Sequence, residues 1–155
     1  MAAMKDLLQR LPELLPLATA WAEAQSTHGA RLGKPLNRAG VTLARRVGVA
    51  HPERIRIVVV KELPMPDDPV LRAAGLQAGL IGAQFSGLTL GYVIFVREGD
   101  ERLELLAHEC RHVAQYESFG SIGAFLTTHL RDVIQVGYWD APLEQDARAF
   151  ESCVR

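Results

Sequence analysis

The N-terminal part of the chain has apolar side chains at helical spacing. In residues 4–25, leucines recur every three or four positions, which predicts an amphipathic helix. Pro12 and Pro16 interrupt this pattern, so we expect a short first turn followed by a helix that starts near one of these prolines. Asn37 is placed to cap a second helix, which is expected to end near Gly48.

The middle of the chain is rich in β-branched and other apolar residues. Residues 54–61 predict a strand, and residues 69–77 predict a short helix. Two further strands are expected in residues 81–85 and 88–96, joined by a tight turn at residues 86–87.

The last third of the chain predicts three helices. Their expected boundaries are marked by capping residues and helix breakers, namely Asp100, Gly120, Ser121, Gly137 and Pro142. Between these boundaries the apolar residues again recur at helical spacing.

The succession of helices, strands and helices predicts an α+β fold. We expect a single domain over residues 1–155, with a helical part in residues 1–50 and strands in residues 54–96. Residues 101–155 would then supply a helix packed against a small antiparallel or mixed sheet, followed by the C-terminal helices.

Composition and charge narrow the function classes. The net charge of −1 provides no overall attraction to nucleic acid or anionic lipid. A group of basic residues in the first half is interpreted as a solvated face, because no aromatic residues alternate with it as they do in nucleic-acid-binding surfaces. The group consists of Arg31, Lys34, Arg38, Arg45, Arg46, Arg54 and Arg56.

Two features bear on membranes and location. Residues 73–96 contain no charge, but glycines and polar residues make them less apolar than a membrane-spanning helix. Charged residues such as Lys5 and Arg10 interrupt the start of the chain, where a secretory signal would need an apolar core. We therefore expect a cytoplasmic protein that does not enter the membrane.

The motif with the clearest chemistry is His-Glu-x-x-His. His108 and His112 lie four positions apart in a segment free of glycine and proline, so one face of a helix can present both imidazoles to one metal ion. Glu109 lies beside this pair, where a general base for a metal-bound water is needed. Cys110 is expected to face the core and not the metal.

A catalytic zinc usually has three protein ligands, so a third ligand must come from elsewhere in the chain. Glu144 fits best, because it stands in the first turn of a helix and borders that helix's buried face. His129 would make a site of three histidines, but it shares an apolar helix face and is interpreted first as a core histidine. The residues downstream that could supply this third ligand are His129, Asp132, Asp140, Glu144 and Asp146.

These residues carry a resemblance to a known family. The segments Ala107-His108-Glu109-Cys110-Arg111-His112-Val113-Ala114-Gln115 and Pro142-Leu143-Glu144-Gln145-Asp146-Ala147 resemble zincin metallopeptidases with a glutamate as third zinc ligand. More narrowly, they resemble small bacterial zincin-like domains. The resemblance implies zinc on His108, His112 and Glu144, Glu109 as base, and a strand beside the helix that pairs with an extended peptide. Ser118 stands where a metzincin would have its third histidine.

The sequence thus predicts a zinc metallopeptidase with a peptide or protein substrate. A donor for the developing oxyanion is sought among Tyr138, His129 and Arg148, and a carboxylate that orients an imidazole among Asp140 and Asp146. The alternative hypothesis is a catalytically inactive zinc-binding scaffold that binds a peptide or a partner protein. Glu109 favours the enzyme, because a structural zinc site does not need a base.

Overall fold

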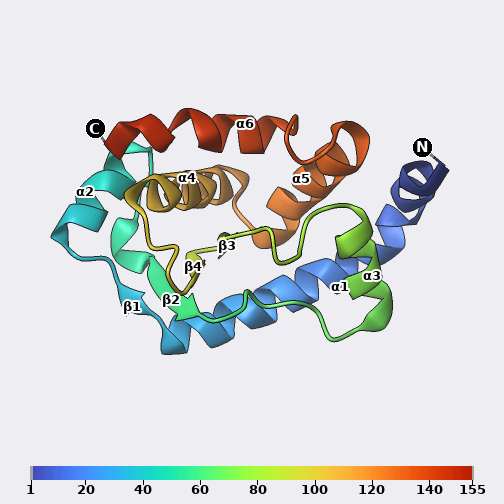
Figure 1. Ribbon diagram of the computed structural model, residues 1–155, viewed down its shortest axis with the longest axis horizontal. Coiled ribbons are helices and arrows are strands. Elements are labelled where there is room, and N and C mark those ends of the chain that lie inside the picture. Colours follow the sequence, from blue (N-terminus) through green and yellow to red (C-terminus); the bar gives the residue numbers. More distant parts are fainter. Residues whose placement is uncertain (1, 155) are drawn as a thin grey trace.

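Helices and a small sheet together make up the chain, as the sequence predicts. The computed structural model describes residues 2–154 (Figure 1) and has an α+β fold. The elements are α1 (Ala2–Leu32), β1 (Lys34–Pro35), α2 (Arg38–Arg46), a 3-10 helix (Pro52–Arg54), β2 (Arg56–Val60), α3 (Pro69–Gln77), β3 (Gly87–Leu90), β4 (Val93–Arg97), α4 (Leu103–Phe119), α5 (Ile122–Val136), α6 (Pro142–Ala149) and a second 3-10 helix (Glu151–Val154).

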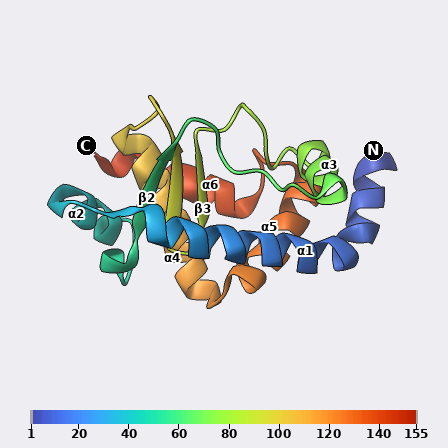
Figure 2. The ribbon, with the colours of Figure 1, turned by 90° about the horizontal axis from the view of Figure 1, so that it is seen from below.

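The sheet is mixed and has the strand order β1-β2-β4-β3. β2 and β4 are parallel, and the two outer pairs are antiparallel. Successive side chains of β4 point to opposite faces. Val93 and Phe95 pack with Ala22 of α1, while Ile94 and Val96 pack with residues of α2 and α4. The sheet therefore lies between α1 and α4, and Figure 2 shows α1 crossing one of its faces.

α1 differs from the prediction. It continues through both Pro12 and Pro16 instead of starting near one of them. Both prolines are exposed, whereas Leu7, Leu11 and Leu14 are buried, so burial of the apolar face offsets the backbone hydrogen bonds that the prolines remove. The first turns run at an angle to the rest of the helix (Figure 2), as expected for a helix that contains proline.

The strands before α4 also differ from the prediction. Residues 81–85 form no strand, because Gly82 has a φ of +140° that extended strands do not use. The predicted strand 88–96 is instead a hairpin of β3 and β4. Its turn includes Gly91, which has a φ of +66°. Residues 86–87, predicted as the turn, lead into β3.

Most helix boundaries match the predicted caps. Asn37 accepts a hydrogen bond from the Gly40 amide, Ser121 accepts one from the Ala124 amide, and Pro142 is the first residue of α6. The exception is α4, which was expected to start after an Asp100 cap. It begins at Leu103, since the Asp100 carboxylate instead accepts a hydrogen bond from Arg97 Nε at 2.9 Å.

Within residues 2–154, no helix has both the length and the apolar character needed to cross a membrane. The uncharged residues 73–96 are divided among α3, a loop and the β3–β4 hairpin. Leu90, Val93 and Ile94 of the hairpin are buried. The apolar content of this stretch therefore belongs to the core around the sheet.

Candidate metal centre

The centre is built on α4. Ala107, Cys110, Val113 and Ala114 belong to the buried cluster that includes Ile94, so one side of this helix is fixed against the sheet. Burial raises the pKa of the Cys110 thiol to about 12, in agreement with the prediction that this cysteine faces the core. The helix is therefore held in a defined rotation, with its histidines on another side.

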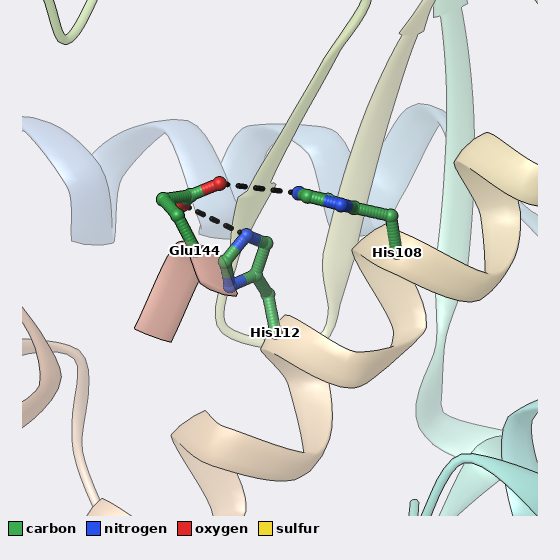
Figure 3. Close-up of side chains that lie close together, drawn as sticks. All are labelled: His108, His112 and Glu144. Carbon is green, nitrogen blue, oxygen red and sulfur yellow. Dashed lines mark hydrogen bonds and ion pairs between the residues drawn. The ribbon is translucent and has the colours of Figure 1, made fainter. Parts of the chain in front are cut away.

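The first turn of α6 brings a carboxylate to these histidines. Glu144 Oε1 lies 3.2 Å from His108 Nε2, and Oε2 lies 3.0 Å from His112 Nε2 (Figure 3). All three side chains are buried, and one donor atom of each lies within 4.8 Å of the others. Two ligands at about 2 Å from one ion, at a tetrahedral angle, are roughly 3.3 Å apart. The group could therefore hold one metal ion.

The charges of this group depend on one another. Burial alone would raise the pKa of Glu144, but hydrogen bonds to His108, His112 and His129 outweigh it and hold that pKa well below its ordinary range. Burial alone would lower the pKa of His112, but the hydrogen bond and charge of Glu144 raise it to about 9. In the metal-free protein the Glu144 carboxylate is thus an anion that favours the protonated imidazole of His112.

His129 of α5 lies at the centre as well. Its Nε2 is 3.2 Å from Glu144 Oε2, and the side chain is buried. The first interpretation of His129 as an ordinary core histidine therefore misses its contact with Glu144, although His129 was also among the sequence candidates for the site. His129 is not one of the three residues grouped around a common point, and among residues 2–154 its Nδ1 has no hydrogen-bond partner. The contact of its Nε2 with Glu144 Oε2 suits a residue that orients the Glu144 carboxylate.

A chain of hydrogen bonds fixes the ring of His112. Gln115 Oε1 lies 2.8 Å from His112 Nδ1, and Gln115 Nε2 donates to Asp146 Oδ2 and the Leu143 carbonyl. Since the Gln115 oxygen is an acceptor, His112 Nδ1 carries the proton and Nε2 is left to bind a metal. Asp146, which also pairs with Arg111 at 2.7 Å, reaches His112 only through Gln115.

Two residues of β3 adjoin the carboxylate of Glu109, and the sequence analysis did not find them. Thr89 Oγ1 donates a hydrogen bond to Glu109 Oε2 at 2.6 Å. A Cβ atom at Gly87 would lie 2.6 Å from Glu109 Oε1, so any larger residue there would displace the carboxylate from its present position. Nothing in the sequence pattern marks either residue, because each reaches Glu109 through the packing of β3 on α4.

The remaining predicted residues divide between the centre and the surface. Burial, followed by the charge of Glu144, raises the pKa of Tyr138, so its hydroxyl stays protonated at neutral pH. Arg148 stacks over the Trp139 ring at 4.0 Å and donates to the Trp139 carbonyl oxygen, so its guanidinium is partnered by Trp139. Asp140 is exposed.

A cavity of about 740 Å³ adjoins the centre. Its wall includes side chains of the centre, namely Glu109, His112, His129, Tyr138 and Glu144. Most of the remaining wall is apolar and comes from α1, α3, α5, β3 and the segments 61–66 and 78–85. His112 and Glu144 of the metal-binding group are therefore open to the same space as Glu109, although each side chain is buried.

The geometry stands without support from related proteins. Comparisons of this chain with protein-family models, curated proteins and solved structures find no match. The resemblance to zincins consequently depends on the motif residues themselves, which α4 and α6 bring together as a group that could hold a metal ion.

Proposed function

We propose that this chain is a zinc-dependent hydrolase that cleaves peptide bonds. The observation that carries the proposal is the convergence of His108, His112 and Glu144 beside Glu109, a carboxylate outside the ligand group that faces the same cavity. Catalytic zinc sites have three protein ligands and an open position, whereas structural sites usually have four protein ligands. Two histidines and one glutamate are a donor set that catalytic zinc uses.

Each nearby side chain has a task in such a reaction. A bound zinc ion would act as a Lewis acid, polarising a carbonyl group and lowering the pKa of a water molecule. Glu109, held by Thr89, would take a proton from the attacking water and pass it to the leaving amine. Tyr138 keeps its proton and faces the cavity, so it is the best placed of the predicted donors to stabilise the developing oxyanion.

The edge of the sheet supports a peptide as substrate. β3 is the last strand on its side, and Arg97 N donates to the Ser86 carbonyl oxygen in the antiparallel pairing with β4. Because hydrogen-bonded positions alternate in such a pair, Gly87 and Thr89 direct their amide and carbonyl groups away from β4. An extended peptide could pair with these groups next to Glu109.

The test measures metal content and hydrolysis separately. Purified protein should contain one equivalent of zinc by mass spectrometry, and Glu144→Ala should lose it. Wild type should hydrolyse an unstructured, dye-labelled protein, and Glu109→Gln should keep its zinc while losing at least about a hundredfold in rate. Equal hydrolysis by both proteins at equal zinc content would contradict the peptidase and leave the zinc-binding scaffold as the better description.

A further inference from the structure

The cavity beside the metal centre is larger and more apolar than the proposed reaction requires. Its volume of about 740 Å³ lies in the range of roughly 300–1,000 Å³ that is typical of ligand-binding pockets. Leu11, Leu14 and Trp21 of α1 form one part of the wall, and Leu71 and Ala74 of α3 form another. These residues are half-buried or buried, so a ligand that enters meets an apolar surface.

Charged side chains in the wall do not change this character. Lys61, Glu62 and Arg72 belong to the wall but are exposed, and they carry charges of both signs. Arg97 is paired with Asp100 at 2.9 Å. Glu109 and Glu144 are the buried acidic residues of the wall, and both belong to the metal centre. Away from that centre the wall offers no buried charge that would select a charged ligand, and burial of apolar groups is the dominant attraction.

The position of the hydrogen-bonding groups decides which apolar ligand fits. Gly87 and Thr89 line the cavity and direct backbone amide and carbonyl groups away from β4. A polypeptide backbone has the complementary donors and acceptors at a matching spacing, whereas an acyl chain has none. The ligand expected from both observations is an extended polypeptide with bulky apolar side chains.

We propose that the cavity between α1, α3 and β3 binds an apolar polypeptide segment and makes the enzyme select bulky apolar side chains beside the cleaved bond. This inference rests on the proposed function. Its physical basis is that large apolar side chains bury surface against α1 and α3, while polar side chains of equal length lose hydration without gaining partners. Segments of this kind are exposed in unfolded proteins and buried in folded ones.

Binding is tested without turnover in the zinc-loaded Glu109→Gln protein. Two fluorescein-labelled peptides of equal length and charge are compared, one with alternating leucine and phenylalanine and one with serine and asparagine at those positions. We expect the apolar peptide to bind at least about tenfold more tightly. Equal affinities for the two peptides would overturn the inference. It would also be overturned if the protein bound a labelled long-chain acyl probe but neither peptide.

Two matched substitutions on α1 locate the binding. Ala18 lines the cavity, whereas Ala24 is exposed and does not line it. Ala18→Phe should fill part of the space and weaken the apolar peptide about tenfold, while Ala24→Phe should leave its affinity unchanged. If circular dichroism shows that Ala18→Phe is unfolded, Leu71→Gln is used in its place, and it too should weaken binding of the apolar peptide about tenfold. Unchanged affinity in the folded cavity variant would overturn the inference.

Hydrolysis by the wild type separates this inference from the proposed function. Cleavage without preference for apolar residues would overturn the cavity assignment and leave the peptidase standing. Selective apolar binding that Ala18→Phe abolishes, in a wild type that cleaves nothing, would support the cavity as a peptide site and contradict the peptidase.

Discussion

Gln115 Oε1 lies 2.8 Å from Nδ1 of His112, one helical turn along α4. The contact sets which ring nitrogen of His112 is free, since the Gln115 amide nitrogen is already committed to Asp146 and the Leu143 carbonyl. The imidazole is therefore held in an orientation that suits a metal ligand, and Nε2 is the nitrogen that gives up its proton when a metal binds.

Removal of this contact should weaken zinc binding without removing a ligand. Gln115→Met keeps an unbranched side chain of similar length but cannot accept the His112 hydrogen bond. We expect zinc affinity, measured by competition with a chromophoric chelator, to fall about 10- to 100-fold. Gln145→Met is the control, because Gln145 is exposed on α6. An unchanged affinity in Gln115→Met would show that the hydrogen bond does not orient the ligand.

The contact between Thr89 and Glu109 predicts a kinetic effect. Thr89→Val removes the hydroxyl that donates to Glu109 Oε2 at 2.6 Å and leaves a side chain of the same shape. We expect kcat to fall about tenfold with zinc content unchanged, because the base loses its orientation while the ligands are untouched. Thr89→Ser keeps the hydroxyl and should retain most of the activity.

Thr42→Val serves as control for the loss of a hydroxyl elsewhere. Thr42 is exposed on α2, where its hydroxyl bonds only to the carbonyl of Arg38. The Thr42→Val protein should have the same kcat as the wild type. If Thr89→Val and Thr42→Val are equally active, the hydrogen bond to Glu109 has no part in the reaction.

The metal-binding group was more predictable from the sequence than the residues around it. His108 and His112 are related by local helix geometry, and Pro142 places Glu144 in the first turn of its helix. Thr89 and His129 reach the centre only through packing between elements distant in sequence. His129 was a candidate by residue type alone and Thr89 was not one, and no spacing predicts either contact, so tertiary structure brings both to the site.

The distinction between local and tertiary contacts also explains which helix boundaries were predicted wrongly. Caps such as Asn37 and Ser121 act through their own local hydrogen bonds and were predicted correctly. Pro12 and Pro16 were expected to break the first helix, but burial of its apolar face against distant residues keeps α1 continuous. Asp100 was expected to cap α4, but the partner it uses is Arg97.

The close packing of α1 on the sheet predicts a stability effect. A Cβ atom at Gly29 would lie 2.6 Å from Val93 Cγ1 and 2.9 Å from Phe95 Cζ, so Gly29→Ala must separate α1 from β4. We expect a loss of about 1–3 kcal/mol in the free energy of unfolding, measured by urea denaturation. Gly123→Ala is the matched control, because its nearest neighbour, Thr19, lies at an ordinary contact distance of 3.4 Å. A Gly29→Ala protein as stable as wild type would contradict this packing.

The coupling of His112 to Glu144 predicts how the stability of the metal-free protein depends on pH. The pKa of His112 is raised to about 9 in the folded protein, against about 6.5 in an unfolded chain. A raised pKa means that the folded state binds the proton more tightly. The stabilisation is therefore complete below about pH 6.5 and is lost as pH rises toward 9, at up to about 1.4 kcal/mol per pH unit for one proton.

Bound zinc should abolish this decline of stability with rising pH. An imidazole that binds a metal must be unprotonated, so zinc affinity rises with pH over the range in which the metal-free protein loses stability. Urea denaturation between pH 6.5 and 9 should thus show a decline for chelator-treated protein and none for zinc-saturated protein. His112→Gln cannot take up the proton and should show a flatter profile without metal. Parallel declines with and without zinc would mean that His112 keeps its proton when the ion is present, which is incompatible with its role as a ligand.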